Sequence, residues 1–176
     1  MSMLGRLFRS RSAPGPDPRE ALRPLWHRIV ELSREPALYR DDGVADTVTG
    51  RFDMITVILA VVLMRLERDR VMAPEAALLT ELFVEDMDGQ LRESGVGDVV
   101  VGKKIGTFVS VLGGRLGALR EARASGVRAM LEAALARNVT MLEGRDTAAL
   151  AARVQAFDDQ VAALDSKTLL GGGIAL

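Results

Sequence analysis

The stretch Asp53-MITVILAVVLM-Arg65, with its uncharged run from Met54 to Met64, is the strongest indication of the fold of this chain. Every residue of that run except Thr56 is apolar, so a helix formed by it would be hydrophobic on all sides, as helices at the centre of a bundle are. A membrane span needs about 20 apolar residues, whereas a run of roughly 10–14 is more often a buried core helix. We therefore expect a central, buried helix and no membrane span.

The composition favours helices around this centre. The chain has 176 residues, which suits a single domain, and 48% of them are hydrophobic although only 4% are aromatic. The apolar content is therefore mostly Leu, Ala and Val, whereas strands are enriched in aromatic and β-branched residues. This balance predicts an all-α fold.

Capping residues and apolar periodicity predict a single-domain bundle of about six helices over residues 17–168. Residues 37–50 are expected to form a polar connector, and the glycine-rich residues 169–176 a flexible tail. The expected helices run from Asp17 to Pro36, Arg51 to Asp69, Pro74 to Ser94 and Asp98 to Arg123, and onward from Ser125 and from Asp146.

Several classes of function are excluded by composition. The chain has no cysteine and only His27 as histidine, so it offers no thiolate chemistry and no histidine-rich metal site. Its formal net charge is −1, which is not the footprint of a nucleic-acid-binding protein. The segment Gly97-DVVV-Gly102-Lys103-Lys104 is a chance match to a phosphate-binding loop, because Lys104 replaces the required hydroxyl and no strand precedes it. We predict no cofactor, no metal and no catalytic residue.

Residues 1–16 are expected to form a basic, flexible tail. Arg6, Arg9 and Arg11 meet no acid before Asp17. Apolar residues at helical spacing could form a short amphipathic turn within residues 1–12 that contacts an anionic membrane surface. A disordered terminus and a cleaved transit peptide are the alternatives.

Four glycines lie on one side of the expected helix over 98–123, and each costs about 1 kcal/mol relative to alanine. The bare ridge that they form either packs inside the bundle or provides a groove for a helix of another protein. We expect internal packing at Gly106 and an open groove at Gly113. The four glycines are Gly102, Gly106, Gly113 and Gly117.

Asp86 is a second unusual position, because helical spacing places it on the apolar side of its helix, between Leu82 and Phe83. A carboxylate there needs a partner, since an unpaired buried charge is very costly. Arg51 or Lys104 could close an internal salt bridge with it. Alternatively, Asp86 lines a groove and waits for a ligand or partner.

Two segments carry a resemblance to a known family. LYRDDGVADTVTGRFDM over residues 38–54 resembles the LY…GVxDTxxGRF segment of the ubiquinol–cytochrome c chaperone family, and LFVEDMDGQLRESGVGDVVVGKK over residues 82–104 resembles its LFxxDMDxxLREMGVGDxxVGKK segment. They occur in the family's order, with one hydrophobic helix between them. The chain departs from the pattern at Ser94, where the family has methionine, and at Gly89.

The resemblance implies a non-catalytic assembly chaperone for ubiquinol–cytochrome c reductase. It would be a bacterial member at the cytoplasmic face of the inner membrane, holding cytochrome b or an early assembly intermediate, with or without a small partner subunit. The client would bind between two walls of a groove. One wall comprises Tyr39, Asp46, Thr47, Arg51, Phe52 and Asp53, and the other Asp86, Asp88, Arg92, Glu93, Lys103 and Lys104, with Gly106 and Gly113 alongside.

Two other functions are also compatible with the sequence. A small helical bundle that binds a lipid or a quinone could use the same groove. A helical enzyme acting on an isoprenoid diphosphate would need clustered Asp-x-x-x-Asp motifs, and none is prominent.

Overall fold

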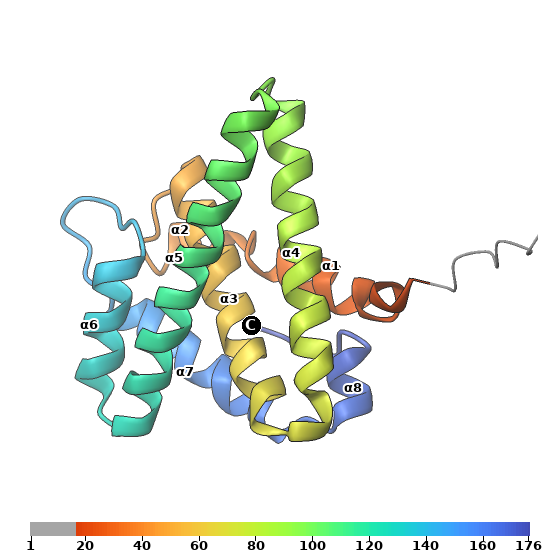
Figure 1. The fold of residues 1–176 in the computed structure, drawn as a ribbon. Helices are drawn as coiled ribbons and strands as arrows, with labels where there is room; N and C mark the ends of the chain where they lie inside the picture. Colours follow the sequence, from red (N-terminus) through yellow and green to blue (C-terminus); the bar gives the residue numbers. More distant parts are fainter. Residues whose placement is uncertain (1–16) are drawn as a thin grey trace, which may run out of the picture.

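A computed structural model describes residues 17–176 and confirms an all-α bundle with a central hydrophobic helix (Figure 1). The six expected helices correspond to η2 with α1, and to α3, α4, α5, α6 and α7. The part of the chain described also contains two five-residue helices, α2 and α8. The elements are η2 (Pro18–Leu22), α1 (Arg23–Leu32), α2 (Pro36–Arg40), α3 (Val48–Arg68), η3 (Arg70–Met72), α4 (Ala73–Glu93), α5 (Asp98–Ser125), α6 (Arg128–Asn138), α7 (Ala148–Ala163) and α8 (Ser166–Leu170).

Helix α3 is the centre of the molecule. The Thr47 side chain caps its first turn by accepting a hydrogen bond from the Gly50 amide at 3.0 Å. All residues from Asp53 to Met64 are buried, and α1, α4, α5 and α7 pack around them. No helix within residues 17–176 is long and apolar enough to cross a membrane.

Helix α2 lies inside the segment that we expected to be a polar connector. Pro36 was expected to end the first helix, and it occupies the first turn of α2 instead, where its missing amide hydrogen costs nothing. Leu38 gives this short helix a fully buried anchor. The helix is too short to leave a periodic pattern in the sequence, which explains why the prediction missed it.

The C-terminal segment differs from the flexible tail that we expected over residues 169–176. Leu169 and Ile174 are buried, and α8 packs against α1. The Arg28 guanidinium donates a hydrogen bond to the Ile174 carbonyl at 3.0 Å. The glycines between these two anchors allow a tight turn, with Gly172 at a φ of 81°, so they return the chain to the bundle.

Helices α4 and α5 form a hairpin whose tip projects above the rest of the bundle (Figure 1). Gly95 turns the chain after α4 with a φ of 77°, as expected for the residue that ends this helix. Residues 1–16, with the predicted basic tail and membrane contact, lie outside the described residues.

Candidate functional site

The first family-like segment has a mainly structural role. Val44 is buried and forms an antiparallel bridge with Met141, in the loop that follows α6. Ala45 donates its amide hydrogen to the Thr140 carbonyl at 2.9 Å. A Cβ atom at Gly50 would overlap the Ala45 carbonyl, so only glycine fits there. The segment therefore holds the start of α3 against the loop that follows α6.

Asp53 does not line a groove, contrary to our expectation. Its side chain is 4% exposed and forms an ion pair with Arg115 of α5, which is 9% exposed. The other carboxylate oxygen accepts hydrogen bonds from the Thr140 amide at 2.9 Å and the Thr140 hydroxyl at 2.7 Å. Asp53 therefore joins α3, α5 and the loop after α6. Sequence periodicity could not reveal this role, because both partner residues, Arg115 and Thr140, are distant in sequence.

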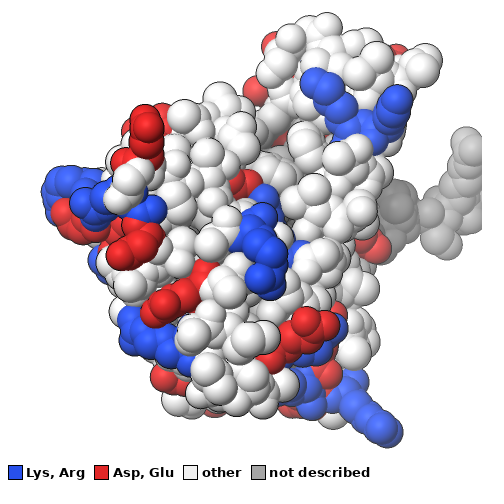
Figure 2. Space-filling view, turned by 90° about the vertical axis from the view of Figure 1, so that its left-hand side faces the viewer, with Lys and Arg blue, Asp and Glu red and all other residues white. Residues whose placement is uncertain are grey.

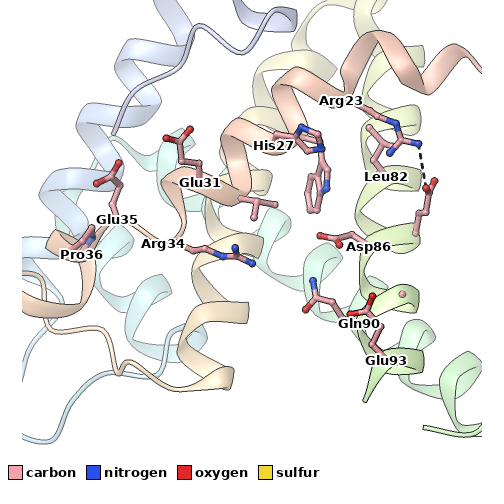
Figure 3. Close-up of a pocket in the computed structure, with 14 residues that line it drawn as sticks. Arg23, His27, Glu31, Arg34, Glu35, Pro36, Leu82, Asp86, Gln90 and Glu93 are labelled. Carbon is pink, nitrogen blue, oxygen red and sulfur yellow. Dashed lines mark hydrogen bonds and ion pairs between the residues drawn. The ribbon is translucent and has the colours of Figure 1, made fainter. Parts of the chain in front are cut away.

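A cleft of about 920 Å³ lies between α1 and α4, and we call it the α1–α4 cleft (Figure 3). Trp26 and Leu82 are buried apolar residues of its lining. Trp26 packs edge-on against Phe83, with ring centroids 6.1 Å apart. The rest of the lining is polar or charged apart from Val30, Pro36 and Gly89, and comprises Arg23, His27, Glu31, Arg34, Glu35, Glu85, Asp86, Gln90 and Glu93.

Asp86 lines this cleft and does not form the internal salt bridge that we considered. It is half-buried and has no ion pair with any described residue, and its carboxylate points into the cleft (Figure 3). Arg51, one of the expected partners, pairs with Asp46 at 2.6 Å instead. Lys104, the other, is exposed on α5. The structure therefore agrees with the alternative in which Asp86 lines a groove.

A smaller cavity of about 490 Å³ adjoins the cleft, and we call it the Tyr39 pocket. Arg34 and Pro36 line both hollows, so the two are neighbours. Burial raises the pKa of Tyr39, whose hydroxyl donates a hydrogen bond to the Ser33 carbonyl. The lining also includes Arg40, Asp46 and Arg51.

The ring of Phe52 packs between α4 and α5 and lines neither hollow. Its centroid lies 4.7 Å from that of Phe108 and 6.4 Å from that of Phe83. The expected walls are only partly brought together. Tyr39, Asp46, Arg51, Asp86 and Glu93 line the two neighbouring hollows, whereas Thr47 caps a helix and Asp53 is in the core.

The remaining predicted residues lie on the projecting hairpin. Arg92 bridges Asp88, at 2.6 Å, and Asp98, and so ties the end of α4 to the start of α5. Lys103 and Lys104 are exposed, and Val99 is 91% exposed. The projecting tip at the top of Figure 2 is mostly uncharged, with basic side chains beside it.

The glycine ridge of α5 faces outward, which corrects the internal packing that we expected at Gly106. A Cβ atom added at Gly102, Gly106, Gly113 or Gly117 would meet nothing within 4 Å. The core side of α5 lies on the opposite part of the helix, through Leu112, Arg115 and Leu119. The ridge is therefore a bare outer surface.

The sequence analysis missed several residues that line the cleft. Trp26, Arg34 and Gln90 were not among the predicted site residues, although all three line it. The helical spacing of Gln90 from Asp86 was the only available signal on α4. For Trp26 and Arg34 there was none, because the packing of α1 against α4 is not encoded in local periodicity. No cluster of three or more His, Cys, Asp or Glu side chains suited to a metal occurs within residues 17–176.

Comparisons with known proteins agree with this architecture. The crystal structure of the Cbp3 homolog from Brucella abortus is similar over 89% of this chain and 88% of that one, with a TM-score of 0.76 and 28% sequence identity. No match was found among curated protein sequences. The family described as "Ubiquinol-cytochrome C chaperone" matches residues 40–176. The chain therefore belongs to the ubiquinol–cytochrome c chaperone family, whose members assist the assembly of the cytochrome bc complex.

Proposed function

We propose that this protein binds newly made cytochrome b during assembly of the cytochrome bc complex and holds it without catalysing a reaction. The protein would act at the cytoplasmic face of the inner membrane. The single observation that carries the proposal is the pair of neighbouring hollows, the α1–α4 cleft and the Tyr39 pocket, in a chain of this family.

The two family-like segments contain residues that stabilise the fold and others that have no ion-pair partner within its described part, and the second group supports this assignment. Gly50, Asp53 and Arg92 are engaged by the fold itself. Asp86 and Lys104 are not, because neither forms an ion pair with a described residue. Polar side chains that folding leaves unengaged are available to a partner, so the binding surface is sought around Asp86 and at the hairpin.

The lining of the α1–α4 cleft favours a protein client over a lipid or quinone. Seven of its lining residues are Arg, Asp or Glu, and only four are large apolar residues or proline, namely Trp26, Val30, Pro36 and Leu82. A pocket for an isoprenoid chain is lined mainly by apolar side chains. Native mass spectrometry of the purified protein tests this alternative, because a co-purifying lipid would support it.

The proposal is tested in a deletion strain. We expect the loss of this protein to lower membrane b-type haem, read from absorption spectra, and to lower c₁-type cytochrome, while soluble metabolic enzymes stay unchanged. Normal levels of both cytochromes in the deletion strain would refute the assignment. Affinity purification of the full chain should also recover cytochrome b from the wild-type membrane fraction.

A further inference from the structure

We propose that the α1–α4 cleft binds a Lys/Arg-rich segment of the membrane-protein client, next to one of its transmembrane helices. This inference rests on the proposed function and names the part of the client that is held. Three features of the cleft support it: the acidic wall formed by α4, the buried apolar residues of the lining, and the bare backbone at Gly89.

The α4 wall of the cleft is acidic. Glu85, Asp86 and Glu93 line the cleft from α4, which contributes no basic residue to it. Glu85 is paired with Arg19 at 2.7 Å, whereas Asp86 and Glu93 have no ion pair with a described residue. The opposite wall is balanced, with Arg23 and Arg34 against Glu31 and Glu35. The cleft as a whole therefore carries an excess of negative charge.

The free carboxylates are spaced along the cleft. Asp86 and Glu93 are seven residues apart on one face of α4, which is about 10 Å along a helix. Basic residues two turns apart on a helical client segment, or about three residues apart on an extended one, would match this spacing. The close-up shows Asp86 and Gln90 directed into the space between α4 and Arg34 (Figure 3).

Gly89 leaves part of the α4 wall of the cleft without a side chain. This glycine lies within α4 and lines the cleft, and a Cβ atom there would meet nothing within 4 Å. Trp26 and Leu82 provide an apolar floor below it. An amphipathic segment could therefore place an apolar side chain on the floor while its basic residues reach the two carboxylates.

This chemistry matches the cytoplasmic parts of a membrane protein. Segments beside transmembrane helices on the cytoplasmic side are enriched in Lys and Arg. A client segment of this kind would carry basic residues next to an apolar stretch. The cleft offers the complementary pair of surfaces, acidic on α4 and apolar at the floor.

Peptide binding to the purified full chain tests the inference. The probe is a labelled synthetic peptide with Leu and Arg at helical spacing, and its control has Gln in place of every Arg. We expect anisotropy to show binding of the basic peptide only, weakened by salt because the contacts are electrostatic. The variant D86K/E93K should weaken binding by about tenfold or more. Equal binding of both peptides, or none, would overturn the inference.

A matched control separates the cleft from overall charge. The variant E81K/E121K makes the same change in net charge at exposed acids outside the cleft lining, and we expect it to bind normally. Gly89→Leu fills the cleft without a steric clash, so it should keep the fold and lose the peptide. Gly114→Leu, an exposed helical glycine away from the cleft, should change neither property. Loss of binding in both charge variants would overturn the inference.

Recovery of cytochrome b distinguishes this inference from the proposed function. If the wild-type chain recovers cytochrome b and D86K/E93K recovers it equally well, the cleft is not the site although the chaperone function stands. If the wild-type chain recovers none, both proposals fail. A photo-crosslinking residue at Gln90 should form adducts with cytochrome b, and adducts with lipid, with a second copy or with residues 1–16 of the chain would overturn the inference.

Discussion

Asp53 and Arg115 form an ion pair in the interior of the bundle, between the central helix α3 and the hairpin helix α5. Arg115 also donates a hydrogen bond to the Thr56 hydroxyl, and its guanidinium lies over the Phe52 ring at 5.6 Å. Both charges are removed from water, so each depends on the other. The pair fixes the position of α5 relative to α3, and through α5 it fixes the base of the projecting hairpin.

Asp53→Ala is expected to lower the free energy of unfolding by about 3–5 kcal/mol, because it leaves Arg115 as an uncompensated buried charge. Urea denaturation followed by circular dichroism measures the change. The control is Asp46→Ala, which removes an exposed ion pair with Arg51 and should have a far smaller effect. Equal effects of the two substitutions would show that the pair is not an important element of the fold.

Gly50→Ala should destabilise the protein by about 3 kcal/mol or more, because the new Cβ atom would overlap the Ala45 carbonyl. Gly117→Ala in α5 is the matched control. It has open space around it and should gain about 1 kcal/mol from helix propensity. Thermal unfolding of the two variants should therefore move the Tm in opposite directions. A stable Gly50→Ala variant would contradict the close approach of α3 to the preceding loop.

Replacing both Gly106 and Gly113 by leucine should leave the Tm unchanged or slightly raised, because both positions face open space. If the client also contacts this ridge, the double variant should no longer restore cytochrome b assembly in the deletion strain. Gly114→Leu, on another side of α5, should restore it. An early-melting double variant would indicate that the ridge packs inside the folded protein.

Acid titration should reveal a contribution from Asp17, the N-cap of η2. Hydrogen bonds from the side chain and the amide of Arg19 lower the pKa of Asp17 to about 2. The unfolded chain therefore binds this proton more readily, so the stabilising effect is present above a pH of about 4 and is lost as the pH falls towards 2. The difference in unfolding free energy between the wild type and Asp17→Asn should shrink over that window. A pH-independent difference would contradict the assignment.

Asp158 should behave in the opposite way. Burial raises its pKa, although the guanidinium of Arg123 at 2.6 Å opposes the shift. The folded state then binds the proton more readily than the unfolded chain, so this group favours folding more as the pH falls through its raised pKa. Side-chain carboxyl chemical shifts, followed by NMR from neutral to acid pH, should show Asp158 titrating well above Asp17. The reverse order would contradict both assignments.

Composition and apolar periodicity were enough to predict the all-α fold and the central helix α3. The run from Met54 to Met64 is apolar on all sides, and only the interior of a bundle can bury such a helix. The stripe on α7 was equally clear, since Leu150, Val154, Phe157 and Val161 recur at helical spacing and are all buried. Local periodicity suffices for these elements because each one must bury its own apolar face.

The roles of the polar and glycine positions, in contrast, depend on how the helices pack against one another. Asp53 and Asp86 are both acidic residues next to apolar residues in the sequence. In the structure, however, Asp53 forms an ion pair with Arg115 in the core, whereas Asp86 lines a cleft. The outward direction of Gly106 likewise depends on which side of α5 the bundle covers. These outcomes are set by partners tens of residues away, such as Arg115 for Asp53 and α1 for Asp86. Whether a charged residue or a glycine is buried depends on which helices pack beside it, and local sequence periodicity does not specify that packing.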